Sequence, residues 1–177
     1  MLTPTWFCLV TQTLNRLEST DTSRVAVLGI GNELSGDDGA GVKITEGLKS
    51  YQKDPATRES TATRLIISAG LAPENFTGQL RRFRPDMVIL IDAADLGSAP
   101  GKVVWLSWKD TVGMSWSTHS LPLSILAQYL VAEIGCGVYL LGIQVSSNGF
   151  GEALTLPVVE AVDDVVQGLG AILFPRV

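Results

Sequence analysis

The stretch VAVLGIGNELSGDDGAG, residues 25–41, decides how the rest of the chain is interpreted. It opens with six residues that carry no polar side chain, as expected for a strand buried on both faces of a parallel sheet. A glycine-rich loop follows, and residues 39–51 then repeat apolar side chains at helical spacing, with Val42, Ile44 and Leu48 expected to face inward. The pattern predicts a strand, a tight loop and a helix in direct succession.

Strands and helices continue to alternate along the chain. Further strands are expected at residues 65–68, 87–91, 103–106 and 138–143, and further helices at residues 3–17, 72–83, 120–134 and 157–173. This alternation predicts a three-layer α/β fold with a largely parallel, five-stranded twisted sheet and helices on both faces. Residues 1–23 are expected to be an N-terminal extension, and residues 24–177 a single domain.

Composition limits the partners and the compartment. The chain is 46% hydrophobic and 18% charged, with a net charge of -5, so nucleic-acid phosphates and anionic lipids would repel it. No apolar run reaches the ~20 residues that a transmembrane helix needs, and the first basic residue, Arg16, comes too late for a signal peptide. The two cysteines, Cys8 and Cys136, form neither a disulfide framework nor a zinc motif, which favours a cytoplasmic location.

The polar residues of interest follow the predicted strands. Asp37 and Asp38 follow the first strand, Asp92 directly follows the third, and His119 lies between the fourth strand and its helix. We expect these loops to leave the same carboxyl edge of the sheet, where α/β proteins bind ligands. Carboxylates with an imidazole suit zinc, nickel or iron, and three protein ligands leave coordination positions open. The sequence therefore predicts a divalent-metal site formed by Asp38, Asp92 and His119.

Each of these residues also has a purely structural interpretation. Asp37 or Asp38, taken alone, is more readily a helix cap, although two adjacent aspartates are one more than a cap requires. Asp92 fits a turn held by its side chain about as well as a site. His119, taken alone, fits a helix start or a packing position. The coincidence of three such residues at one edge favours the metal site.

Other chemistries receive less support. The glycines of residues 29–36 lack the spacing of the dinucleotide fingerprint, and no Gly-Lys-Ser/Thr phosphate loop is present. Cys136 joins a predicted helix to the next strand, so we expect it at the edge opposite His119, and Cys8 lies outside the predicted sheet. A thiol nucleophile activated by the single histidine is therefore disfavoured.

Several motifs in the right order resemble those of the hydrogenase maturation proteases. They are the glycine–aspartate motif at residues 29–41, the acidic motif IDAAD at 91–95, the histidine motif STHSLPL at 117–123 and LGIQ at 141–144. The segment APEN at residues 72–75 most resembles the branch that serves formate-hydrogenlyase-type hydrogenases. The resemblance covers residues 24–162, and Glu33 occupies a variable place in it.

This resemblance implies a metal-dependent, aspartic-type endopeptidase that trims the C-terminal tail of the nickel-iron hydrogenase large subunit. The precursor of that subunit would be the partner, nickel would arrive inside it, and the protease would be a monomer. The family's metal-contacting positions carry over to Asp38, Asp92 and His119, with Asp38 the first candidate for a general base. Gln144 and Gly70, at strand ends of the same edge, are candidates for binding the substrate tail, with packing and turn geometry as the alternative.

Two other function classes use the same residues. A non-catalytic nickel checkpoint or metallochaperone would bind the loaded precursor without cutting it. A small-molecule-binding α/β protein would use the glycine loop without metal, and His119 would then be dispensable.

Overall fold

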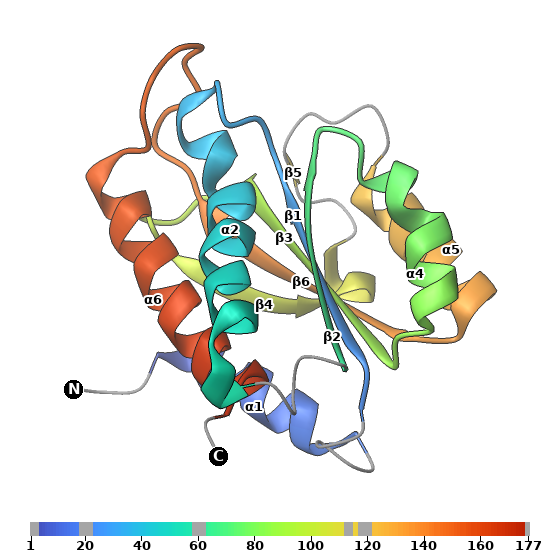
Figure 1. The fold of residues 1–177 in the computed structure, drawn as a ribbon. Coiled ribbons are helices and arrows are strands. Elements are labelled where there is room, and N and C mark those ends of the chain that lie inside the picture. Colours follow the sequence, from blue (N-terminus) through green and yellow to red (C-terminus); the bar gives the residue numbers. More distant parts are fainter. Residues whose placement is uncertain (1–3, 18–22, 58–62, 112–114, 117–121, 176–177) are drawn as a thin grey trace.

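The computed structural model describes residues 4–17, 23–57, 63–111, 115–116 and 122–175. A twisted sheet lies between two helical layers (Figure 1). Its strands are β1 (Val25–Ile30), β2 (Arg64–Gly70), β3 (Met87–Asp95), β4 (Val103–Ser107), the two-residue β5 (Ser115–Trp116) and β6 (Gly137–Gln144). The order is β2-β1-β3-β6-β4, and β5 pairs with β3. The predicted three-layer α/β fold with five main strands is confirmed.

Strand direction is parallel through the centre of the sheet and antiparallel in two places. β1 is parallel to β2 and β3, and β3 is parallel to β6. β4 runs antiparallel to β6, and β5 runs antiparallel to β3. The central strands β1 and β3 are buried almost throughout, as their apolar sequences predict.

The direction of β4 corrects the expectation that the loop after it leaves the carboxyl edge. Val103 pairs with Ile143, and Ser107 pairs with Tyr139, so β4 ends at the amino edge. Only residues 96–102 connect β3 to β4. A parallel crossover takes a dozen or more residues, so this short connection requires an antiparallel neighbour.

Strand β4 ends at the amino edge of the sheet, and β5 lies back at the carboxyl edge. Trp116 pairs with Ala94 and Ser115 with Asp95, which places the backbone of β5 beside the carboxyl end of β3. β3 itself continues to Asp95, beyond the predicted end at residue 91, because β5 and β6 pair with its last residues. Asp92 therefore lies inside the strand, opposite Gly142 of β6, and does not follow it.

Helices cover both faces of the sheet. One layer holds α1 (Thr5–Asn15), α2 (Ala40–Lys53) and α6 (Leu156–Leu173), and the other holds the 3-10 turn η3 (Pro73–Phe76), α4 (Thr77–Phe83) and α5 (Leu123–Ile134) (Figure 1). Each layer buries its own apolar cluster against the sheet. The predicted inward-facing residues Val42, Ile44 and Leu48 are buried. No helix in the described part of the chain is both long and apolar enough to cross a membrane.

The N-terminal helix α1 belongs to the packed core. Trp6, Val10 and Leu14 are buried in the cluster that also contains residues of α2, α6 and the sheet. Trp105 of β4 donates a hydrogen bond from Nε1 to Thr13 Oγ1 at 3.2 Å. The helix thus covers β4, which no other helix of that layer contacts as extensively.

The start of α2 lies directly on the sheet because two glycines face each other there. A Cβ on Gly41 would lie 2.4 Å from the carbonyl oxygens of both Ile30 and Ile91, and a Cβ on Gly29 would lie 2.1 Å from Gly41 O. Neither position has room for a side chain. This contact fixes the residues just before α2 over the carboxyl ends of β1 and β3.

Replacing Gly41 with alanine should therefore destabilise the fold. Overpacking of a tight interior site costs about 1–3 kcal/mol, and backbone neighbours can relax little. Gly78→Ala in α4 is the matched control, since a Cβ at this position would lie 3.8 Å from Arg82 Nη1, in ordinary contact, and alanine favours the helix. Urea unfolding should show a lower midpoint for Gly41→Ala and an equal or higher one for Gly78→Ala. Equal midpoints for Gly41→Ala and the unmodified chain would contradict this packing.

Candidate active site

The loop after β1 ends in a short 3-10 helix, η1 (Gly36–Gly39), which carries the two adjacent aspartates. Asp37 is fully buried. Its carboxylate accepts four hydrogen bonds of 2.7–3.0 Å, from the backbone N–H groups of Ser146, Ser147 and Thr155 and from Thr155 Oγ1. These donors follow β6, and β1 and β6 are the two long neighbours of β3. Asp37 therefore joins the loops on either side of β3.

Asp37 thus has a structural role that the sequence did not reveal. The N-cap positions of η1 and α2 are Ser35 and Gly39, so neither aspartate is an N-cap residue. The backbone N–H of Asp37 also donates to Ser147 O at 2.9 Å. The one sequence feature that pointed to a second role was the presence of two adjacent aspartates where a helix cap requires one.

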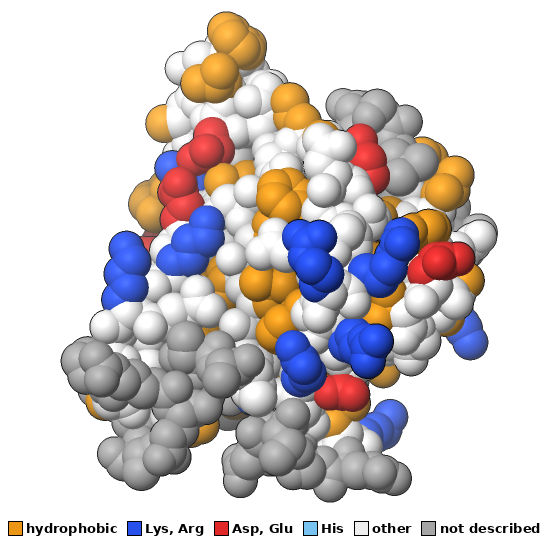
Figure 2. All heavy atoms as spheres, turned by 45° about the vertical axis from the view of Figure 1, so that its right-hand side comes forward, with side chains coloured by type: hydrophobic (Ala, Val, Ile, Leu, Met, Phe, Trp, Pro, Cys, Tyr) orange, Lys and Arg blue, Asp and Glu red, His pale blue; other side chains and the backbone are white. Residues whose placement is uncertain are grey.

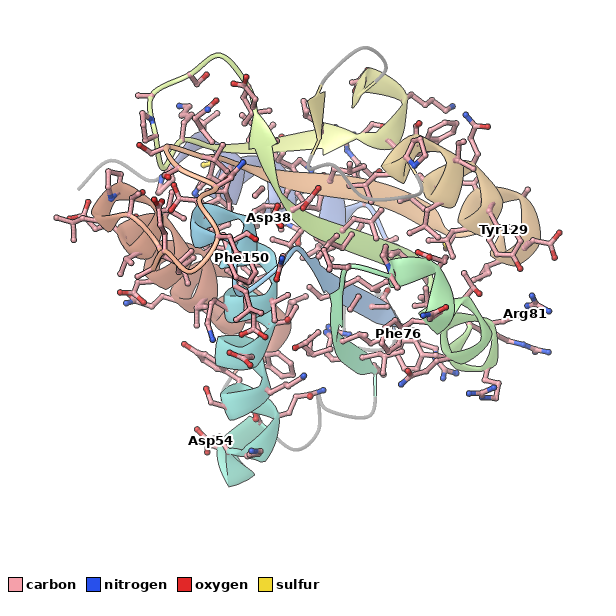
Figure 3. All side chains as sticks on the ribbon, turned by 90° about the horizontal axis from the view of Figure 1, so that it is seen from above. Asp38, Asp54, Phe76, Arg81, Tyr129 and Phe150 are labelled. Atoms are coloured by element: carbon pink, nitrogen blue, oxygen red, sulfur yellow. The ribbon has the colours of Figure 1, made fainter. Side chains whose placement is uncertain are left out.

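Asp38 is the next residue of η1 and, unlike Asp37, it is only half-buried. Its Oδ2 accepts a hydrogen bond from the backbone N–H of Asn32 at 2.7 Å. Its backbone rests on Gly31, where a Cβ would lie 1.7 Å from Asp38 O. In the view onto the carboxyl edge, Asp38 lies between the start of α2 and β3 (Figure 3). The carboxylate that sequence reasoning assigned to metal and base chemistry therefore lies at the predicted edge.

Asp92 lies at the same edge on the neighbouring strand. It is fully buried and directly follows Ile91, whose carbonyl oxygen faces Gly41. The 3-10 helix that carries Asp38 lies against β3. The structure therefore brings the loops and strands of the two carboxylates together, as the sequence predicted.

His119 lies outside the described residues, so its place in the site stays a prediction. No three histidine, cysteine or acidic side chains gather into a metal site within the described part of the chain. The predicted set of three includes His119 and so cannot be complete there.

Comparison with known proteins decides the family. The HycI family, described as hydrogenase maturation protease, matches residues 42–171 of this chain, a span that includes Asp92 and begins just after Asp38. This chain belongs to the hydrogenase maturation protease family. Membership places it among the proteases that act in hydrogenase maturation.

Individual relatives agree with this assignment. The protease is 35% identical over 144 residues to the hydrogenase 3 maturation protease of Escherichia coli K12. The matched region covers 81% of this chain and 86% of the relative. It superposes on the NiFe hydrogenase maturation protease HycI from Thermococcus kodakarensis KOD1 with a TM-score of 0.79 and 30% identity, over 93% and 98% of the two chains. The endopeptidase HycI from Escherichia coli gives a TM-score of 0.66 at 31% identity, over 81% and 87%.

Two further residues predicted for the substrate tail have different surroundings in the protease. Gln144 is buried, and its Oε1 accepts hydrogen bonds from the backbone N–H groups of Leu96 and Ser98 at 2.7 and 3.1 Å. This is the turn geometry given as the alternative role. Gly70 has a positive φ of 62°, and no heavy atom of the described residues, apart from its chain neighbours, would lie within 4 Å of a Cβ at this position.

The buried thiol lies far from this edge, as predicted. Cys136 connects α5 to β6, where Gly137 pairs with Met87 at the amino end of β3. Burial raises the pKa of the Cys136 thiol to about 11, so it stays protonated at neutral pH. A protonated thiol at the opposite edge does not support the nucleophilic alternative.

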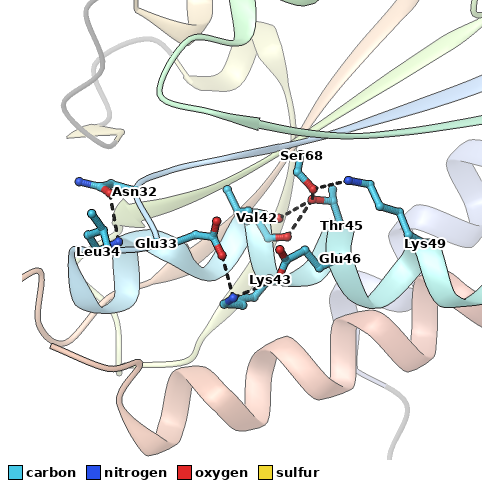
Figure 4. A network of polar contacts seen from close by, with 10 residues as sticks. Asn32, Glu33, Leu34, Val42, Lys43, Thr45, Glu46, Lys49 and Ser68 are labelled. Carbon is cyan, nitrogen blue, oxygen red and sulfur yellow. Dashed lines mark hydrogen bonds and ion pairs between the residues drawn. The ribbon is translucent and has the colours of Figure 1, made fainter. Parts of the chain in front are cut away.

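Polar contacts join α2 to the loop that follows β1 and to strand β2 (Figure 4). Lys43 forms ion pairs with Glu33 at 2.7 Å and Glu46 at 3.0 Å, and hydrogen bonds to these carboxylates raise the pKa of Lys43. Lys49 and Thr45 both contact Ser68 Oγ of β2, at 2.7 and 3.0 Å. Glu33 thus pairs with a lysine in the first turns of α2, which is consistent with its variable place in the motif.

Exposed apolar side chains surround the edge that carries Asp38. Phe150 is 80% exposed and Leu34 61% exposed, and the backbone N–H of Gly151 donates to Leu34 O at 2.7 Å. Leu71, directly after β2, and Leu156, at the start of α6, are also exposed. We call Leu34, Leu71, Phe150 and Leu156 the apolar rim.

Replacing Asp37 with asparagine should destabilise the protease more than the same change at Asp38. The amide at residue 37 would present N–H to a donor in a buried site, at a cost of about 2–3 kcal/mol. The amide at residue 38 keeps an oxygen for Asn32 N–H, so its cost should stay under about 1 kcal/mol. Chemical denaturation measures both. Equal losses of unfolding free energy would contradict the assigned roles.

Proposed function

We propose that this protease removes the C-terminal tail of the nickel-loaded precursor of a nickel-iron hydrogenase large subunit and recognises the nickel that the substrate carries. The observation that carries the proposal is the contact at one edge of the sheet between η1, which carries Asp38, and β3, which carries Asp92. The similar solved protein from Thermococcus kodakarensis is a NiFe hydrogenase maturation protease, which supports the same class of substrate.

The proposed nickel contacts are Asp38, Asp92 and His119. Carboxylate and imidazole groups suit nickel, and three protein ligands leave room for donors from the precursor. The position of β5 supports the inclusion of His119, because Trp116 pairs with Ala94 and His119 follows three residues later. At ~3.6 Å per residue, the Cα of His119 is at most about 11 Å from that of Trp116.

Docking through the metal would place the adjacent peptide bond beside Asp38. An empty precursor would lack this anchor, so its scissile bond would not be held in register. Asp38 is half-buried and follows a loop at the surface, which suits a base that takes a proton from an attacking water. Addition of that water forms a C–O bond at the carbonyl carbon. Collapse of the adduct then breaks the C–N bond, and the proton taken up by Asp38 passes to the nitrogen, so the tail leaves as an amine and the subunit ends in a carboxylate.

The apolar rim is the proposed contact for the body of the precursor. Phe150 projects from residues 146–155, a segment that Asp37 fixes by four hydrogen bonds. Exposed apolar side chains held on a fixed backbone are typical of protein-binding surfaces, because little ordering is needed on binding.

Cleavage should depend on nickel and on the three proposed contacts. Matched precursor samples with and without nickel are incubated with the protease, and intact mass reports tail removal. We expect cleavage only of the loaded precursor, and a loss of at least about 100-fold in rate for Asp38→Asn and His119→Ala. Glu33→Gln, in the same loop, is the control and should cleave at the normal rate.

Two results would contradict this proposal. Equal cleavage of the empty precursor would exclude recognition of the metal. Binding of the loaded precursor without any cleavage would favour a nickel checkpoint or metallochaperone.

Replacing Phe150 with serine should weaken the precursor complex without changing the chemical step. We expect KM for the loaded precursor to rise about tenfold, the loss typical of one apolar anchor, with kcat unchanged. Leu9→Ser, on α1, removes another exposed apolar side chain and serves as the control. A fall in kcat at constant KM would contradict a docking role for the rim.

A further inference from the structure

A broad hollow of about 1820 Å³ opens at the amino edge of the sheet, opposite the edge that carries Asp38. Its walls come from residues that precede β1, β3 and β6 and from the ends of α1, α4 and α5. Five arginines line it: Arg16, Arg24, Arg81, Arg82 and Arg84. Figure 2 shows basic side chains gathered over the lower part of the face that includes α4. We call this hollow the arginine groove.

The groove concentrates positive charge in an acidic protein. Its described lining contains five of the eight arginines of the chain and no lysine, although the net charge of the chain is -5. The acidic residues among its described lining are Asp86 and Glu133. Oδ2 of Asp86 accepts a hydrogen bond from the backbone N–H of Arg24 at 2.7 Å, so this oxygen is bonded to the main chain and not to a described guanidinium group.

Neutral partners hold two of the guanidinium groups in place. Arg24 lies over the ring of Phe83, 4.6 Å from its centroid, and Arg81 Nη2 donates to the hydroxyl of Tyr129 at 2.6 Å. These contacts orient the side chains without cancelling their charge. The ion pairs found among the described residues involve only Lys43, so none of the five arginines is neutralised by a described carboxylate.

Arg84 adds an independent sign of selection for this surface. It ends α4 in the left-handed conformation, with φ 51°, and no other non-glycine residue described has a positive φ. Glycine is the residue favoured at such a helix end. An arginine in this strained position points to a use for its charge.

We propose that the arginine groove binds an acidic polypeptide segment of a partner protein. Guanidinium groups form paired hydrogen bonds with carboxylates, and an array of arginines without an ion pair to any described carboxylate offers several such pairs to one segment. A nucleic acid fits less well, because its extended charge would also face the acidic remainder of the protein. The groove and the proposed cleavage site lie at opposite ends of the strands, so both can be occupied at once.

Fluorescence anisotropy with a fluorescein-labelled hexaglutamate peptide tests the groove on the full-length protease. We expect binding that weakens with salt, and at least tenfold weaker binding for the double variant Arg81→Gln/Arg82→Gln. The control Lys102→Gln/Lys109→Gln removes the same charge elsewhere and should change the affinity less than twofold. Arg84→Gly should weaken binding without lowering Tm, because glycine suits the left-handed position.

Three results would overturn the proposal. They are the absence of peptide binding to the unmodified protease, an equal loss of affinity in the lysine control, and tighter binding of a twelve-residue oligothymidylate than of the peptide. Tm of each variant confirms that a loss of binding is not a loss of folding.

Discussion

The buried carboxylate of Asp37 is the interaction on which the geometry of the site depends. It accepts four hydrogen bonds from the segment after β6, while its own backbone belongs to the loop after β1. A buried carboxyl group is tolerated only when its oxygens are hydrogen-bonded, so the loss of these four contacts would be costly and they hold the two loops together. That arrangement places Asp38 beside β3, and it fixes the segment that presents Phe150.

Most of the fold was predictable because its strands are buried on both faces. The apolar run of β1 and the helical spacing of Val42, Ile44 and Leu48 follow from burial alone. The direction of β4 was not read correctly, since apolar pattern does not distinguish parallel from antiparallel neighbours. The length of the connection, residues 96–102, does carry that information, because it is too short for a parallel crossover. The end of β3 was missed because its pairing with β5 is a long-range effect.

The candidate site was predictable to the level of its sheet edge, and less so in the role of each residue. Asp38 and Asp92 lie where alternation of strands and helices places them. Which aspartate of the adjacent pair is structural depends on a contact more than a hundred residues away, and no local pattern encodes it. The arginine groove was likewise hidden, since Arg81 and Arg82 on their own only suit the dipole at the end of α4, whereas Arg16 and Arg24 join them through the fold.

The proposed nickel site requires Asp38, Asp92 and His119 to come within bonding range of one ion. Its test is a crystal structure of the protein soaked with nickel, with anomalous data collected at the nickel edge. We expect a single anomalous peak about 2.1 Å from an oxygen of each carboxylate and from a nitrogen of the imidazole. An imidazole many ångströms from both carboxylates, with no nickel peak between them, would contradict it.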